Sequence, residues 1–141
     1  MKEYITTTLV AAPPDSVWAI LTDGAAYADW NPEIVTVDGA IVPGARITAH
    51  VRLGGGAIRR VTQRVRVFAA PHHMEWVGGL PLGLFVGRRV FTVTPVASGT
   101  EFRMHLYMSG PLSSMILKSV GDRQPAIDGF SAGLKRHAER A

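Results

Sequence analysis

The chain has 141 residues, a length that predicts one domain, residues 1–141, with room for a sizeable core. Hydrophobic residues make up 47% of the chain and charged residues 18%, a balance that fits a globular protein. Cysteine is absent, which excludes disulfides, thiolate metal sites and cysteine nucleophiles. No segment reaches the ~18 apolar residues that span a bilayer, and the first residues lack the apolar stretch of a signal peptide. We therefore expect a cytoplasmic protein without an integral membrane segment.

The net charge of +4 comes from arginines concentrated between Arg46 and Arg103. Three of them, Arg60, Arg64 and Arg66, alternate with uncharged residues and form a basic stripe on one face of a predicted strand. The stripe is interpreted either as a solvated sheet face or as a surface for peripheral contact with anionic lipid. Nucleic acid is not expected as a partner, because no aromatic residues are interleaved for base stacking.

The first part of the chain predicts a strand followed by two short helices. Residues 4–10 are rich in threonine and β-branched residues, which favours a strand. Residues 13–16 (PPDS) begin a helix, because proline fits the first turn and Asp or Ser can cap free N–H groups. A second short helix is expected from Asp23 and ends before Trp30, since Pro32 disfavours helix at the residue before it.

The middle of the chain has a period of two, in which apolar and polar residues alternate and Pro or Gly breaks the pattern. This period predicts consecutive antiparallel strands with one solvent-facing side and one core-facing side. The Gly-rich apolar loop at residues 78–85 is interpreted as a lid, as a loop that contacts a membrane or partner, or as a tucked-in loop. We expect strands at residues 34–37, 46–53, 58–68, 72–77, 86–94 and 100–108.

The last thirty residues change to helical spacing, first around residues 112–120 and again around residues 127–138. Gly121 and Pro125 lie between these segments, so the helix should kink or restart there. The order of elements predicts an α+β fold in which a seven-stranded curved antiparallel sheet wraps around the long C-terminal helix. The two short helices come between the first and second strands.

Several motifs resemble those of the START-like superfamily, also called the SRPBCC or Bet v 1-like superfamily, and within it the bacterial polyketide cyclase/dehydrase-type group. The resemblance covers essentially the whole chain and implies a helix-grip fold with an apolar cavity between the sheet and the C-terminal helix. Members include lipid carriers, hormone receptors, cyclases, coenzyme-binding proteins and Hsp90 co-chaperone modules. The motifs are APPDSVW at residues 12–18, LTD at 21–23, YADWNP at 27–32, MEW at 74–76, FTVTP at 91–95, GT at 99–100 and GLK at 133–135.

Alternation along the strands assigns an inward row to each of them, and the row of the last strand is unusually apolar for this superfamily. Val67 is also expected to point inward. The cavity residues expected from these rows and from the helix are Trp30, Gln63, His72, Met74, Trp76, Arg89, Phe91, Met104, Leu106, Met108, Ile127, Phe130 and Leu134. The residues expected at the cavity mouth or lid are Tyr27, Leu80, Leu82 and Phe85.

Arg89 and Gln63 stand out because a charge or amide that faces a core needs a partner or water. Arg89 is interpreted as an anchor for a carboxylate or another anionic head on an apolar ligand, or else as a strand-end residue that reaches solvent. The five histidines lack the spacing of a metal site, so neither a metal nor a cofactor is expected. Asp29 and Glu33 flank Trp30, and either carboxylate could act as a base at a cavity mouth.

Three functions remain open from the sequence. The first is binding of a small hydrophobic molecule such as a lipid, an isoprenoid or a polyketide, for transport, sequestration or sensing. The second is a cyclase, aromatase or dehydrase-type enzyme with a polar pair drawn from Arg89, His72 and Tyr27. The third is a protein- or membrane-interaction module that uses the basic stripe and the loop at residues 78–85. Either a monomer or a homodimer is expected.

Overall fold

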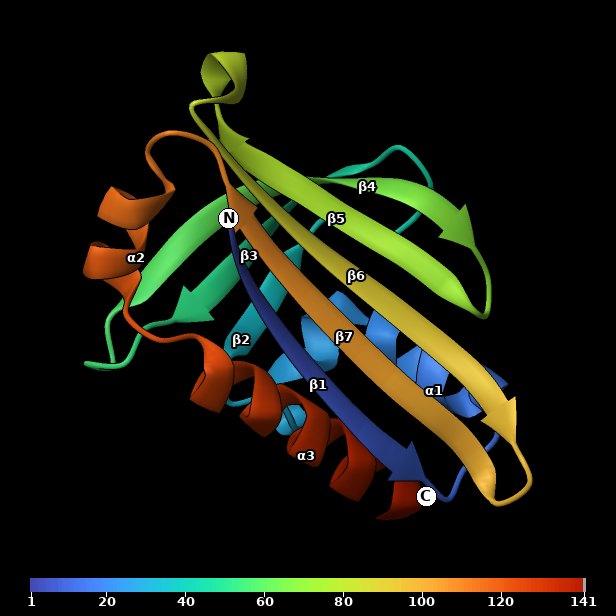
Figure 1. The fold of residues 1–141 in the computed structure, drawn as a ribbon. Helices are drawn as coiled ribbons and strands as arrows, with labels where there is room; N and C mark the ends of the chain where they lie inside the picture. Colours follow the sequence, from blue (N-terminus) through green and yellow to red (C-terminus); the bar gives the residue numbers. More distant parts are fainter. Residues whose placement is uncertain (141) are drawn as a thin grey trace.

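The computed structural model describes residues 1–140, apart from the side chain of Val67, whose predicted inward position lies outside the described part. Seven strands form one antiparallel sheet in the order β1-β7-β6-β5-β4-β3-β2, so the first and last strands in sequence are neighbours (Figure 1). The strands are β1 Lys2–Val10, β2 Ile34–Asp38, β3 Arg46–Arg52, β4 Ile58–Ala69, β5 His73–Leu80, β6 Phe85–Val96 and β7 Gly99–Ser109.

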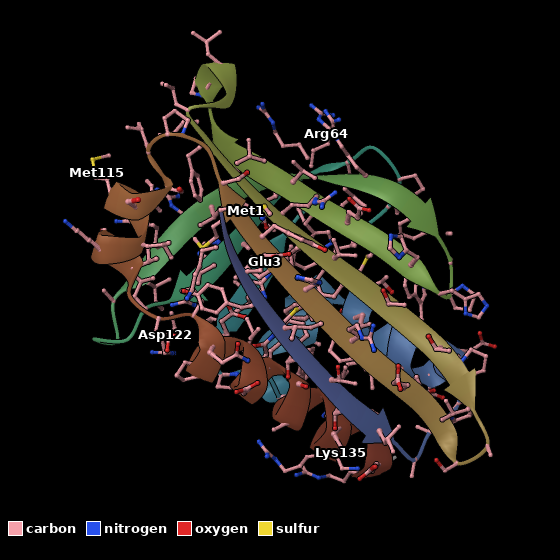
Figure 2. The ribbon with its side chains drawn as sticks, in the orientation of Figure 1. Met1, Glu3, Arg64, Met115, Asp122 and Lys135 are labelled. Atoms are coloured by element: carbon pink, nitrogen blue, oxygen red, sulfur yellow. The ribbon has the colours of Figure 1, made fainter. Side chains whose placement is uncertain are left out.

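The predicted alternation of faces is present in the sheet. On β7, Phe102, Met104 and Leu106 are buried, while Arg103 between them is exposed. The basic stripe faces outward on β4, where Arg64 points away from the helices (Figure 2). Apolar side chains therefore line the concave face, and charged side chains cover the convex face.

Two strand ends differ from the prediction. Residues 78–80 continue β5 and pair with β6 as far as Leu80 opposite Phe85, so only the short helical turn η2, Pro81–Gly83, remains of the expected loop. Gly79 permits this close pairing, because a Cβ there would lie 2.1 Å from the backbone oxygen of Phe85. At the other end of β5, the backbone N–H of His72 donates to Ala69 in a turn, so the strand begins only at His73.

The helices are α1 Pro14–Thr22, η1 Gly24–Asp29, α2 Ser113–Val120 and α3 Gln124–Arg140. The predicted restart is confirmed: α2 ends at Gly121, whose φ of +77° ends the helix, and α3 begins three residues later. In Figure 1, α3 runs along β1 and α2 continues the cover beyond the N-terminal end of α3. The architecture is the α+β helix-grip fold, a curved sheet of seven strands around a C-terminal helix.

The core is densest where α3 crosses the sheet. Phe130 of α3 lies among the rings of Phe91, Phe102 and Trp30, with ring centroids 5.2–6.0 Å apart. Trp76 adds its ring 4.7 Å from Phe91. All of these side chains are at most 8% exposed, so this part of the concave face is filled by aromatic packing.

Candidate functional site

A cavity of about 340 Å³ lies between the concave face of the sheet and α2, and we refer to it as the α2 cavity. On β6, Gly87 stands between Phe85 and Arg89 on the inner side and contributes no side chain, so the wall is recessed there. The apolar wall consists of Val51, Leu53, Val61, Leu80, Phe85, Leu106, Met108, Ile116 and Val120. The cavity therefore offers mainly aliphatic surface to a guest molecule.

A buried ion cluster forms the polar wall of the α2 cavity. The carboxylate of Glu33 accepts two hydrogen bonds from Arg89, each 2.8 Å long, and a third of 3.1 Å from Nη2 of Arg123. The side chain of Glu33 is 0% exposed, that of Arg89 7% and that of Arg123 6%. One carboxylate thus faces two guanidinium groups, and the cluster carries a net positive charge.

Local structure before β2 fixes the position of Glu33. The side-chain oxygen of Asn31 accepts hydrogen bonds from the backbone N–H groups of Glu33 and Ile34, both at 2.9 Å. The carbonyl of Glu33 accepts a bond from the N–H of Arg52 at 2.7 Å, which ties the segment to the end of β3. The carboxylate is therefore held at the sheet edge and directed toward the inner side of β6.

Charge pairing decides the protonation of this cluster. Burial alone would raise the pKa of Glu33, but Arg89 first and Arg123 second hold that pKa below its ordinary value. Burial would likewise lower the pKa of Arg89, and Glu33 more than offsets it, so the pKa of Arg89 is raised. Glu33 and Arg89 are accordingly both ionised at neutral pH, and Glu33 is a poor proton acceptor.

Arg123 sits where two cavities meet. It belongs to the short segment between α2 and α3, and it lines both the α2 cavity and a second cavity of about 310 Å³. The second cavity, which we call the side cavity, also contains Pro32, Asp122 and Pro125. The Glu33–Arg123 contact therefore stands between the two spaces.

The residues expected in the cavity fall into two groups. Gln63, Arg89, Leu106 and Met108 line the α2 cavity, together with Leu80 and Phe85 from the expected lid. A second group is fully buried and packs under α3 or against it: Tyr27, Met74, Trp76, Phe91, Met104, Ile127, Phe130 and Leu134.

The three remaining expected residues lie apart from the α2 cavity. Leu82 is 97% exposed at the tip of η2. His72 is exposed in the turn before β5, where its ring lies 3.2 Å from the carbonyl of Val93. Trp30 packs against Phe130 of α3 and does not line the α2 cavity.

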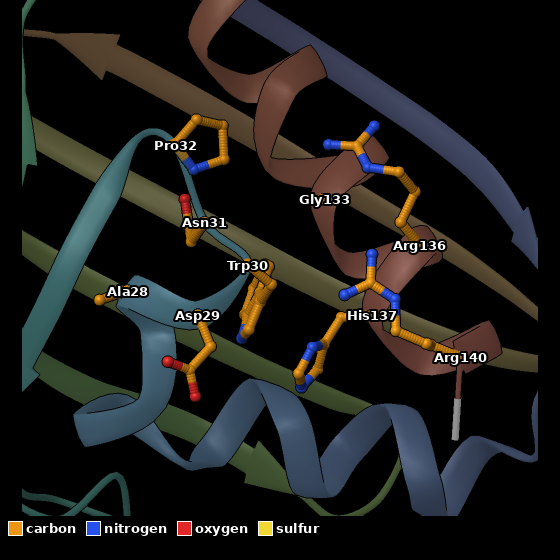
Figure 3. Close-up of a pocket in the computed structure, with 9 residues that line it drawn as sticks. All are labelled: Ala28, Asp29, Trp30, Asn31, Pro32, Gly133, Arg136, His137 and Arg140. Atoms are coloured by element: carbon orange, nitrogen blue, oxygen red, sulfur yellow. The ribbon is translucent and has the colours of Figure 1, made fainter.

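Trp30 borders a third, polar pocket of about 290 Å³. Figure 3 shows this pocket, in which His137 of α3 faces Trp30 and Arg136 and Arg140 lie along the same helix. The Trp30 loop approaches α3 closely, because a Cβ on Gly133 would lie 2.1 Å from the Trp30 carbonyl oxygen. The pocket is separate from the α2 cavity and shares none of its lining residues.

Sequence reasoning missed Arg123 and treated Glu33 only as a possible base. Arg123 lies outside regular structure, where no periodicity assigns a face to a side chain. The inward position of Arg89 indicated that a buried counter-charge was needed, and Glu33 was already a candidate acidic residue because it lies near Trp30 in the sequence.

Within residues 1–140, no group of three acidic or histidine side chains could hold a metal ion. Among the helices of this part, none is both long and apolar enough to cross a membrane.

Comparisons with known proteins agree with this architecture. Protein MLL2253 from Mesorhizobium loti is 18% identical, with a TM-score of 0.75 over 99% of this chain and 98% of its own. A START superfamily protein from Mycobacterium smegmatis is 17% identical, with a TM-score of 0.71 over 98% and 97%. The hypothetical protein jhp0584 from Helicobacter pylori is 13% identical, with a TM-score of 0.77 over 97% and 88%.

At these identities the solved structures show the fold alone. No curated protein matches the sequence. The sequence of residues 1–139 matches the family described as polyketide cyclase/dehydrase and lipid transport. The chain therefore belongs to the polyketide cyclase/dehydrase and lipid transport family, with a START-like fold.

Proposed function

We propose that this protein binds a small hydrophobic molecule in the α2 cavity, as a cytoplasmic carrier, store or sensor of a lipid, an isoprenoid or a polyketide. The observation that carries the proposal is an aliphatic cavity of about 340 Å³ with one ionic wall. Apolar walls with a few fixed polar groups are typical of sites for small ligands, and the volume falls within their usual range of roughly 300–1,000 Å³. The family description, which includes lipid transport, supports the same reading.

The helix α2 is the part of the wall that can move to admit a ligand. None of its eight residues is fully buried, whereas α3 has six buried residues. Gly110 and Gly121 flank α2 with φ angles of +100° and +77°, a backbone region open mainly to glycine. We therefore assign α2 as the cover of the site, with contacts weak enough for local opening.

The test uses a variant that fills the cavity from its recessed wall. In Gly87→Leu the new side chain would project into the α2 cavity, and its Cβ would approach no atom outside the neighbouring residues more closely than 3.6 Å. Gly55→Leu is the matched control, because Gly55 lies in the exposed β3–β4 hairpin with no atom within 4 Å. We expect the wild type and Gly55→Leu to bind the neutral dye Nile red, and Gly87→Leu to lose that binding.

Native mass spectrometry of gently purified protein gives a second readout, because a retained ligand adds mass and the same spectrum reports whether the protein is a monomer or a homodimer. Equal dye binding by Gly87→Leu and the wild type would contradict the proposed site. Absence of both dye binding and any retained ligand would contradict the proposed function.

An enzyme of the cyclase or dehydrase type is the alternative use of the same cavity, and the presence of Glu33 in the wall is the observation that favours it. Against it, the lowered pKa of Glu33 weakens that residue as a base, and Tyr27 is buried with its hydroxyl donating to the carbonyl of Leu21. His72 is exposed in the turn before β5 and does not line the α2 cavity. The alternative predicts turnover of a polyketide substrate that Glu33→Gln abolishes.

The mouth of the α2 cavity also supports a peripheral contact with an anionic membrane surface. Leu80, Leu82 and Leu84 are 42%, 97% and 41% exposed at the η2 tip, and the carbonyl of Leu84 accepts a 2.9 Å hydrogen bond from the N–H of Leu112, just before α2. Met115 of α2 is 57% exposed and points away from the sheet (Figure 2). Exposed arginines on neighbouring β4 supply the positive charge that anionic lipid attracts.

Co-sedimentation with vesicles tests this contact. Wild-type protein should bind vesicles of phosphatidylglycerol more than vesicles of phosphatidylcholine, and added salt should weaken the binding. Leu82→Asp should abolish binding, whereas Val42→Asp, which changes another exposed apolar residue, should not. Equal binding by Leu82→Asp and the wild type would contradict the proposed contact.

A further inference from the structure

We propose that the ligand of the α2 cavity is an acidic amphiphile, an apolar molecule with one negatively charged head, and that Arg123 holds the head. The proposal rests on the function proposed above and specifies the chemical class of the ligand. It begins from a charge imbalance: arginines outnumber acids in the wall, where Glu33 is the single carboxylate among the lining residues.

The excess positive charge is buried. The side chains of Arg89 and Arg123 are 7% and 6% exposed, and one carboxylate neutralises only one of them. A buried charge without a counter-ion is strongly unfavourable, so a second anion at this wall would be stabilised. A neutral lipid would leave the imbalance in place, whereas a carboxylate or phosphate head would remove it.

The two arginines differ in how many donors remain free. Arg89 directs both terminal nitrogens to the two oxygens of Glu33, and one of them also approaches the sulfur of Met104 at 3.3 Å. Arg123 makes one hydrogen bond within the described residues, from Nη2 to Glu33. A guanidinium has five N–H donors, so Arg123 keeps unused donors at the border of both cavities. Arg123 is therefore the residue with donors to spare for an anion, and Arg89 is its support.

A third cation, Arg59, lies on the same inner face of the sheet. Arg59 is opposite Val51 in the β3–β4 register and shares the face of Gln63, and both of these neighbours line the α2 cavity. Arg59 is exposed and makes no ion pair among the described side chains. It can attract an anionic head to the cavity, while Gln63 supplies an amide along the path.

This geometry orients the ligand. The head lies toward Arg123 at the junction with the side cavity, where charge-assisted hydrogen bonds are available. The tail lies along Leu106 and Met108 on β7 and under Ile116 on α2, in the space that Gly87 leaves open. Recognition then depends on the charge of the head and tolerates variation in the tail.

The experiment compares decanoate with decan-1-ol, two probes with the same tail and different heads, by displacement of Nile red at pH 7.5. Wild-type protein should bind decanoate at least about tenfold more tightly than decan-1-ol, the ratio expected from one or two hydrogen bonds between charged groups. Arg123→Gln should reduce decanoate affinity by about tenfold and change decan-1-ol affinity by less than about twofold. Arg123→Lys should restore part of the loss.

Arg136→Gln is the matched control, because Arg136 is an exposed arginine of α3 that borders the Trp30 pocket and not the α2 cavity. It should leave both affinities unchanged. Equal wild-type affinity for the two probes, or equal loss of both in Arg123→Gln, would overturn the inference and leave the hydrophobic site standing. Binding of neither probe would count against the proposed function itself and against the acidic ligand with it.

Discussion

The concave face of the sheet has two halves. Inward-facing strand side chains line both halves, but α3 covers one half and α2 covers the other. Under α3 the space is filled by rings, with Phe130 packed between Phe91 and Phe102. Under α2 the space stays open as a cavity of about 340 Å³. The Glu33–Arg89–Arg123 cluster marks the boundary between the halves.

The comparison shows that a helix-grip fold need not be hollow along its whole length. A long helix with six buried residues brings enough side-chain volume to fill its half, whereas the short α2 contributes no fully buried residue. The absence of a side chain at Gly87 on the sheet also keeps the α2 half open, because it leaves the wall recessed below α2. Stability should therefore reside mainly in the α3 half and ligand binding in the α2 half.

A substitution in the Glu33–Arg89–Arg123 cluster at the boundary should have the largest effect on the unfolding free energy. Glu33→Gln removes the counter-charge of two buried guanidinium groups, so we expect it to lower the free energy of unfolding by about 3–5 kcal/mol. Urea denaturation measures this loss. Glu101→Gln is the control, because Glu101 makes a partly exposed 3.8 Å pair with Arg103 and should cost less than about 1 kcal/mol. A loss below about 1 kcal/mol for Glu33→Gln would show that the cluster is not a stabilising boundary.

Truncation of a core side chain to alanine should lower the unfolding free energy more in the α3 half than in the α2 half. Phe130→Ala leaves a void in the ring cluster and should cost about 3–5 kcal/mol of unfolding free energy. Ile116→Ala on α2 should cost less than about 2 kcal/mol, because Ile116 is half-buried and already borders an open space. Equal losses in thermal or urea unfolding would mean that the α2 half is packed as firmly as the α3 half.

Enlarging side chains should give opposite signs in the two halves. Phe102→Trp overfills the ring cluster and should cost about 1–3 kcal/mol of unfolding free energy. Leu106→Phe grows into the α2 cavity and should be neutral or stabilising by about 0.5–2 kcal/mol, while it weakens Nile red binding. If Leu106→Phe destabilised the protein as much as Phe102→Trp, the cavity would be too small to accept the added volume.

The smallest expected effect is a pH dependence of the unfolding free energy, which arises from Glu33 in the boundary cluster. Because the folded state lowers the pKa of Glu33, its contribution to the unfolding free energy is complete above the ordinary glutamate pKa of about 4.3. The contribution is lost as the pH falls below that value and through the lowered pKa. The unfolding free energy of wild type should therefore fall between about pH 5 and pH 3 more steeply than that of Glu33→Gln. Parallel curves would contradict the assignment of an ionised, stabilised Glu33.

Much of the fold was predictable because strands and helices each require a characteristic spacing of apolar residues in the sequence. The alternation in β7 gave the buried row that contains Met104 and Leu106, and Gly121 gave the break between α2 and α3. The end of β5 was misjudged, since Gly78 and Gly79 read as a loop but pair with β6. Glycine signals loops by its conformational freedom, and here it serves close backbone approach instead.

The site was only partly predictable. The inward position of Arg89 follows from alternation, and its burial demanded a partner. The partner Glu33 precedes β2, and the second cation Arg123 lies between two helices. Because neither residue belongs to a regular element, the periodicity of the sequence could not predict the direction of either side chain. Which half of the concave face stays open depends on three-dimensional side-chain volumes, and a list of inward residues does not contain that information.

The most direct test uses the methionine methyl groups as reporters of the two halves. Met108 lines the α2 cavity, and Met74 is fully buried beside Phe91 in the α3 half. In a two-dimensional NMR titration of ¹³C-methyl-methionine protein with decanoate, we expect the Met108 signal to shift with saturation and the Met74 signal to stay in place. A saturable shift of Met74 with a static Met108 would contradict the assignment of the ligand to the α2 half.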